Sequence, residues 1–115
     1  MATLLRIVRT EDPKPADFMP SWGRGLPPRD DPDEALLLWL GLSTWATARQ
    51  AAKKARAWPT LGEYLAELKV PEHPAIVVRR TLSSAGHYSL WGDPRRIARY
   101  VERTFSVQSA LEGLG

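Results

Sequence analysis

Three consecutive residues, Ser43, Thr44 and Trp45, stand where an expected short strand meets the start of an expected helix. Their hydroxyl groups can hydrogen-bond to a ribose or a phosphate. The nearby helix N-terminus favours negative charge, because the first backbone N–H groups of a helix are unpaired. The indole of Trp45 can stack on a base or another flat ring. This stretch predicts a place that holds a nucleotide-like ligand, with turn formation and helix capping as the alternative use of the hydroxyls.

Three further residues have side chains suited to chemistry on such a ligand. The guanidinium of Arg9 can clamp a pyrophosphate with two parallel hydrogen bonds. The carboxylate of Glu67, in an expected strand, can orient a ribose hydroxyl or stabilise a developing cation. The imidazole of His87 suits general acid–base work near neutral pH. The alternatives are a surface arginine, a glutamate paired across a sheet with Arg79 or Arg80, and a half-buried structural histidine.

Composition excludes several kinds of site. The chain has no cysteine, so it has no disulfide, no thiolate metal site and no cysteine nucleophile. Two histidines are too few for a His-rich metal site, and no metal is expected. The phosphate loops GxGxxG and GxxxxGK[ST] and the nucleophile motif GxSxG do not occur.

Basic residues offer a competing prediction. Residues 1–48 hold 5 basic and 7 acidic side chains, a net charge of −2, whereas residues 49–103 hold 11 basic and 5 acidic, a net charge of +6. Two sets have the spacing of a helix face and predict a surface that tracks the phosphates of a nucleic acid: Arg49, Lys53 and Arg56, and Arg95, Arg99 and Arg103. A solvated helix face is the alternative, and it is favoured because the tryptophans, Trp58 among them, are expected in the core.

Periodicity and capping residues place these candidates on elements. Apolar and β-branched runs predict strands, and Asp or Thr caps followed by apolar periodicity predict helices. The expected strands are Leu4–Val8, a short strand at 43–45, Leu61–Val70, Ala75–Leu82, His87–Trp91 and Thr104–Val107. The expected helices are Pro32–Leu40, Ala48–Trp58 and a final helix that begins at Pro94 and carries Ile97, Val101 and either Thr104 or Phe105 on its inner face.

These elements predict an α+β fold with a mixed or mainly antiparallel sheet and about three helices. The 115 residues suffice for a single domain, which we expect to span residues 1–107. A proline-rich arm is expected at 11–28, pinned to the body by large apolar residues such as Phe18. Residues 108–115 are expected to form a flexible tail. The sequence contains neither an 18-residue apolar run nor a signal-peptide pattern, so a cytoplasmic location without membrane contact is expected.

The order of these features resembles the ADP-ribosyltransferase-like domains, including toxin and RES-type members. The resemblance covers roughly residues 4–72: LLRIV followed by Arg9, then Ser43-Thr44-Trp45, then the helix Ala48–Trp58, then YLAELKVPE. It implies that Arg9, Ser43, Thr44 and Trp45 hold NAD, and that a glutamate on a later strand orients the ribose. The Glu-x-Glu element of the family is absent, since no glutamate occurs between Glu72 and Glu102. Glu67 and His87 are therefore the candidates for a catalytic role.

Three hypotheses follow. The first is a nucleotide-binding or NAD-binding domain, which would act as a transferase or an NAD-consuming enzyme in a toxin–antitoxin or defence setting. The second is a non-catalytic interaction module of the same fold, which binds a cognate protein partner. The third is a nucleic-acid binder that uses the arginine-rich helix faces.

Overall fold

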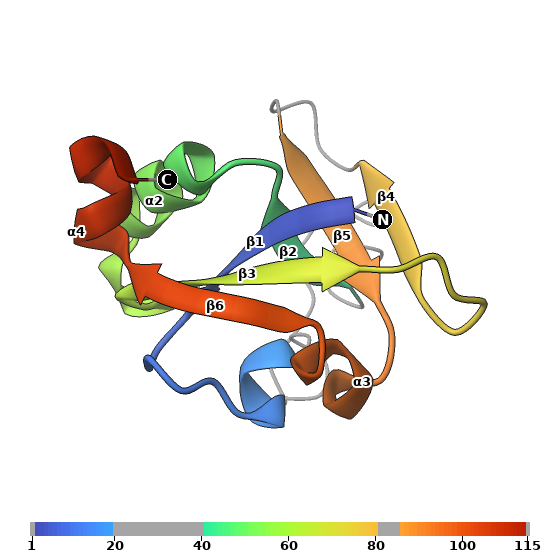
Figure 1. Cartoon of the computed structure of the whole chain (residues 1–115). Coiled ribbons are helices and arrows are strands. Elements are labelled where there is room, and N and C mark those ends of the chain that lie inside the picture. Colours follow the sequence, from blue (N-terminus) through green and yellow to red (C-terminus); the bar gives the residue numbers. More distant parts are fainter. Residues whose placement is uncertain (1, 20–40, 81–85, 115) are drawn as a thin grey trace, which may run out of the picture.

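The computed structural model of the chain describes residues 2–19, 41–80 and 86–114. A six-stranded sheet runs through it in the order β4-β5-β2-β1-β3-β6 (Figure 1). Every described strand pair is antiparallel. Helices pack on this sheet, so the predicted α+β class is confirmed and its sheet is antiparallel.

The strands are β1 (Ala2–Val8), β2 (Leu42–Trp45), β3 (Tyr64–Val70), β4 (Val77–Arg80), β5 (His87–Trp91) and β6 (Val101–Ser106). The helices are α2 (Ala48–Ala57), α3 (Pro94–Ala98) and α4 (Val107–Ser109). Short helical turns complete the described elements: η1 (Pro15–Phe18), η3 (Pro59–Leu61) and η4 (Ala110–Leu114). The predicted helix Pro32–Leu40 and the 20–28 part of the arm lie outside the described residues.

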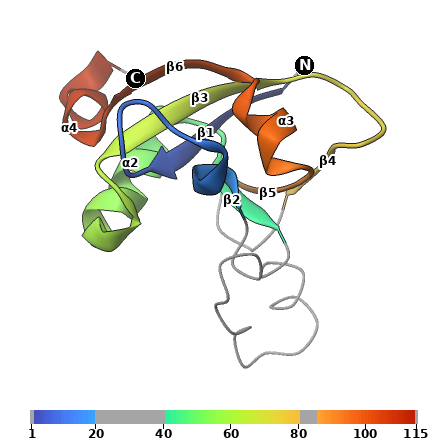
Figure 2. The ribbon, with the colours of Figure 1, turned by 90° about the horizontal axis from the view of Figure 1, so that it is seen from below.

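Each face of the sheet has its own core, because successive side chains of a strand point to opposite faces. One face packs against η1 and α3, which lie in front of the strands when the molecule is seen from below (Figure 2). The other face packs against α2 and the C-terminal turns. Within β1, Leu4 and Val8 belong to the first core, and Leu5 and Ile7 belong to the second.

Helix α2 follows directly from its sequence. The Thr47 hydroxyl accepts a hydrogen bond from the backbone N–H of Gln50 at 3.2 Å, as the predicted cap requires. Four alanines form the inner face and let the helix approach the sheet closely: Ala48, Ala51, Ala52 and Ala55. The helix ends at Ala57, and Trp58 is its C-cap, ahead of Pro59.

The C-terminal part of the chain differs from the prediction. Helix α3 ends at Ala98 after five residues, and Val101–Ser106 forms β6 instead of a continued helix. Strand β6 pairs with the edge of β3 that β1 leaves unpaired. The cross-strand contacts of Val101, Thr104 and Phe105 stabilise this strand more than their helical spacing stabilises a helix. The predicted stripe of Arg95, Arg99 and Arg103 is therefore wrong, since Arg103 lies on a strand.

The last residues also differ from the expected tail. Ser106 caps a turn by accepting from the Ser109 backbone N–H at 3.0 Å. Residues 107–112 are helical, Gly113 departs from helical geometry, and Ala110 is buried against α2. Val107 and Leu111 complete the apolar contact with the alanine face of α2. In the arm, Phe18 is fully buried, which confirms that it pins this segment to the sheet.

Candidate functional site

The Ser-Thr pair is divided between the two faces of the sheet. Leu42 and Thr44 point toward the η1 side, whereas Ser43 and Trp45 point toward the α2 side. Thr44 is fully buried, and its hydroxyl donates to the Tyr88 carbonyl oxygen at 2.9 Å. Of the two hydroxyls, only that of Ser43 lies on the face of α2.

We expect Thr44→Val to lower the free energy of unfolding by about 1 kcal/mol, because it removes one buried hydrogen bond at nearly constant shape. Chemical denaturation of the variant and of the unmodified chain measures this loss. If the role of Thr44 is only structural, the variant should also bind a nucleotide with the same affinity as the unmodified chain. A large loss of affinity at unchanged stability would contradict that role.

The α2-side residues of β2 and β5 form what we call the β2–β5 cluster: Ser43, Trp45, His87 and Ser89. In the strand register, Ser43 is opposite Ser89, and Trp45 is opposite His87. The two rings of the second pair meet edge to face, with centroids 5.4 Å apart at an angle of 81°. His87 and Ser89 are both buried. Hydroxyl, imidazole and indole groups thus gather on one face of two neighbouring strands.

The first turn of α2 closes the end of this cluster. The Ala46 backbone N–H donates to the Gly86 carbonyl oxygen at 2.8 Å, which ties the start of α2 to the start of β5. Gln50, in that first turn, lies against Gly86, where an added Cβ would overlap its carboxamide. Among the described residues, the Oε1 atom of Gln50 is a buried oxygen without a hydrogen-bond partner. An acceptor in need of a donor therefore lies beside His87 and the helix N-terminus.

Glu67 lies at the other end of a row that crosses the sheet. The register places His87, Trp45, Leu5, Glu67 and Arg103 in succession on β5, β2, β1, β3 and β6. Three inter-strand steps of ~4.8 Å place the His87 and Glu67 backbones about 14 Å apart. The structure therefore does not bring these two catalytic candidates to one point.

The Glu67 carboxylate is engaged in ion pairs. Its Oε2 lies 3.2 Å from Nη2 of Arg103, and its Oε1 lies 3.9 Å from Nζ of Lys69. The sequence suggested Arg79 or Arg80 as cross-sheet partners, but both belong to β4 at the opposite edge of the sheet. Long-range strand order, which local patterns do not encode, decides this pairing.

Arg6, rather than Arg9, contacts the Ser43 segment. Its Nη1 donates to the Ser43 carbonyl oxygen at 2.9 Å, and its Nε donates to the Asp17 carbonyl oxygen at 3.3 Å. Arg9 follows the end of β1 and is exposed. Sequence reasoning missed Arg6, although a charged residue inside the apolar run LLRIV was a signal for it. Arg6 extends toward η1, on the face opposite the β2–β5 cluster.

The cationic candidates do not share one surface. Arg49, Lys53 and Arg56 are exposed on α2, whereas Arg95 and Arg99 are exposed on α3, which packs on the other face of the sheet. Trp58, expected in the core, is 59% exposed at the end of α2, so that expectation is wrong. The helix ends at Ala57, and Trp58 is its C-cap.

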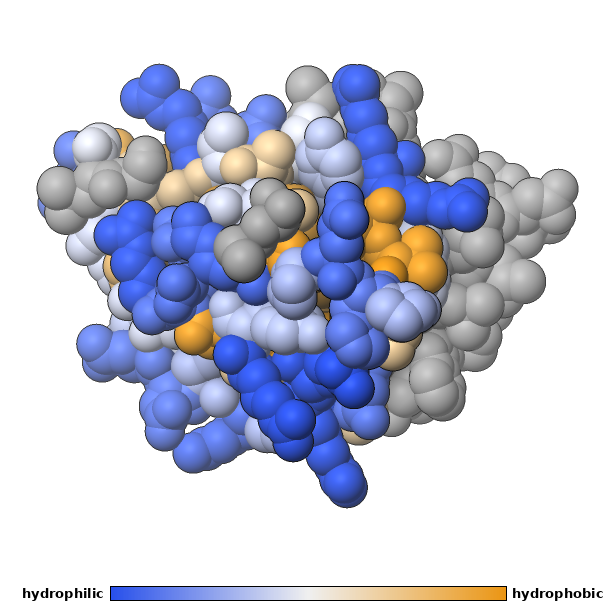
Figure 3. All heavy atoms as spheres, turned by 45° about the vertical axis from the view of Figure 1, so that its right-hand side comes forward, coloured by the Kyte–Doolittle hydropathy of each residue, from blue (hydrophilic) through white to orange (hydrophobic). Residues whose placement is uncertain are grey.

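Edge strand β4 carries both exposed cations and exposed apolar surface. Val77 is 43% exposed, and Arg79 and Arg80 are exposed beside it. Figure 3, in which this side of the molecule comes forward, shows hydrophobic atoms separated by hydrophilic side chains. Charged side chains on an edge strand oppose pairing with another sheet.

Two hollows mark the described surface. One of about 500 Å³ lies between the end of α2 and the β6–α4 junction and is lined in part by Arg56, Glu63 and Tyr64. The other, about 520 Å³, lies beside the connection 71–76. Neither hollow is lined by the β2–β5 cluster. Within residues 2–19, 41–80 and 86–114, no three potential metal ligands gather, and no helix is long and apolar enough to cross a membrane.

Comparison of the chain with protein-family models, curated proteins and solved structures finds no match.

Proposed function

We propose that the chain binds a nucleotide-containing ligand at the β2–β5 cluster, in a domain of the ADP-ribosyltransferase-like type. The ligand implied by that resemblance is NAD. The observation that carries the proposal is the gathering of Ser43, Trp45, His87 and Ser89 on one face, directly beside the N-terminus of α2.

The chemistry of this place suits such a ligand. The hydroxyl of Ser43, which is only half-buried, can hydrogen-bond to a ribose hydroxyl or to a carboxamide. The N-terminus of α2, a helix of ten residues, favours a phosphate. The rings of Trp45 and His87 can contact a base. Arg6 acts from the opposite face by holding the backbone of Ser43.

The proposal concerns binding first. Within the cluster, the imidazole of His87 is the candidate general acid or base, and its role in turnover is part of the proposal. Glu67 lies about 14 Å away along the sheet, as three inter-strand steps require, and is held by Arg103. It therefore serves as the negative control.

Thermal unfolding with NAD, ADP-ribose, ATP or GTP tests the proposal. A ligand at 100 times its Kd should raise the free energy of unfolding by about 2.7 kcal/mol, which for this chain length is a rise in Tm of roughly 10 °C. Ser43→Ala should reduce that rise, because it removes a ligand contact. Glu67→Gln should leave it unchanged. Each rise is measured from the variant's own Tm.

The outcomes separate the hypotheses. No shift with any of the four nucleotides would overturn the proposal and favour the interaction module. A shift that is lost in Glu67→Gln but kept in Ser43→Ala would also overturn it, because the ligand would then lie at the β3–β6 end. Release of free nicotinamide from NAD, lost in His87→Gln, would establish the enzyme.

A further inference from the structure

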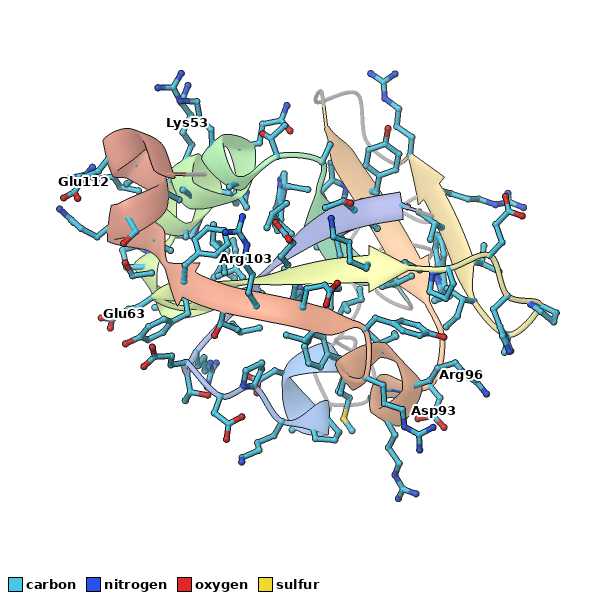
Figure 4. All side chains as sticks on the ribbon, viewed as in Figure 1. Lys53, Glu63, Asp93, Arg96, Arg103 and Glu112 are labelled. Carbon is cyan, nitrogen blue, oxygen red and sulfur yellow. The ribbon has the colours of Figure 1, made fainter. Side chains whose placement is uncertain are left out.

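The outer face of α2 is an uninterrupted cationic surface. The helix contains Arg49, Lys53, Lys54 and Arg56 and no acidic residue. All four side chains are exposed, while the alanines on the inner face are buried. Figure 4 shows Lys53 on α2 pointing away from the sheet. A solvated helix face usually mixes both signs of charge, and this one does not.

No acidic side chain among the described residues forms an ion pair with these four cations. In the part of the chain that the structure describes, the ion pairs join Lys14 to Asp12 and join Lys69 and Arg103 to Glu67. None of them involves α2. Like charges at i and i+4, such as Arg49 and Lys53, repel within a helix. The fold thus retains an unfavourable concentration of positive charge that a polyanion would relieve.

An exposed aromatic ring extends this surface at its C-terminal end. Trp58 is 59% exposed, and the Nζ atom of Lys54 lies 5.4 Å from the ring centroid. Arg56, on the same end of the helix, also lines the hollow of about 500 Å³ that includes Tyr64. A large ring and a hollow therefore adjoin the cations.

We propose that this surface, which we call the α2 surface (Arg49, Lys53, Lys54, Arg56 and Trp58), binds single-stranded nucleic acid. The cations contact successive phosphates, and Trp58 stacks on an unpaired base. The residues from Arg49 to Trp58 span about 13 Å at 1.5 Å per residue, so the contact covers only a few nucleotides.

Three other partners fit the surface less well: a membrane, an acidic peptide and duplex DNA. An amphipathic helix that binds a membrane buries its apolar face in the lipid, but the apolar face of α2 is already buried against the sheet. An acidic peptide would satisfy the cations but leave Trp58 without a flat partner. Duplex DNA offers no unstacked base along its length. The α2 surface meets the β2–β5 cluster only at the first turn of α2, and this proposal does not rest on the proposed function.

Fluorescence anisotropy with labelled 12-nucleotide dT and U oligomers, at salt concentrations from 25 to 300 mM, tests the proposal. Four phosphate contacts predict that log K falls against log salt with a slope of about −2.8, since each contributes about −0.7 on a single strand. Lys53→Gln should reduce the slope by about 0.7. Trp58→Ala should weaken binding roughly 5- to 150-fold, while Trp58→Phe keeps most of the affinity.

Arg95→Gln and Arg99→Gln are the matched controls. They remove the same charge from exposed positions in and directly after α3. Asp93 and Arg96, which are close to Arg95 in the chain, lie far from Lys53 in Figure 4. Both controls should leave the slope and affinity unchanged. Three outcomes would overturn the proposal: no binding at 25 mM salt, an equal loss in the α3 variants, or equal competition by polyglutamate, which would identify an acidic protein partner instead.

Discussion

Replacing Gly62 by alanine is expected to lower the free energy of unfolding by about 4 kcal/mol and the Tm by roughly 15 °C. Gly62 has φ +146°, a conformation that costs other residues about 1–3 kcal/mol. A Cβ at this position would also overlap the carbonyl oxygen of Val8 and lie 2.6 Å from its carbonyl carbon. Val8 is buried and paired with Tyr64, so its backbone has no room to yield.

Gly113→Ala provides the matched control for Gly62→Ala. Gly113 has φ +94°, but an added Cβ there meets no atom within 4 Å. We expect a loss of about 1 kcal/mol, from the backbone conformation alone. Urea denaturation of both variants measures the difference. Equal losses would show that the overlap with Val8 contributes nothing.

Replacing Arg6 by methionine is expected to lower the free energy of unfolding by about 3 kcal/mol. The guanidinium donates to the carbonyl oxygens of Ser43 and Asp17, and it thereby joins β1, β2 and η1. Methionine has similar length but no donor, so both carbonyl groups lose a charged partner. Because the Ser43 backbone is freed, nucleotide binding at the β2–β5 cluster should weaken as well.

Two further variants separate charge from geometry at Arg6. Arg9→Met removes a neighbouring, exposed guanidinium and should change the stability by less than about 0.5 kcal/mol. Arg6→Lys keeps the charge but lacks the planar fork that reaches two acceptors, so we expect it to recover only part of the loss. Denaturant midpoints of the three variants test this order. A loss in Arg9→Met as large as in Arg6→Met would contradict it.

The local elements were largely predictable. Thr47 with Gln50 and the alanine spacing predicted α2, and the apolar runs predicted β1 and β5. These features depend on caps and on periodicity within one segment, which the sequence displays directly. The α+β class followed from the order of the elements. The segment with two compatible patterns was predicted only in part: the expected strand Thr104–Val107 overlaps β6, but residues 101–103 were assigned to the preceding helix and in fact belong to this strand, which pairs with β3.

The candidate site was only partly predictable. The sequence singled out Ser43, Trp45 and His87, and the fold places all three on one face. It also singled out Thr44, which points to the other face, and Glu67, which lies three strands from His87. Ser89 and Gln50 join the cluster only through the pairing of β5 with β2 and the contact of α2 with Gly86. Such contacts join residues far apart in the chain, and one sequence carries no local sign of them.

The sequence by itself determined the secondary-structure types of α2, β1 and β5, the α+β class and the concentration of positive charge after residue 48. The tertiary structure alone decided that Arg6 holds Ser43, that Glu67 pairs with Arg103, and that Trp58 is exposed beside four cations. The physical reason is that caps and periodicity act within a few residues. Strand order and register are set by the sum of contacts across the whole sheet, and that sum determines which side chains meet.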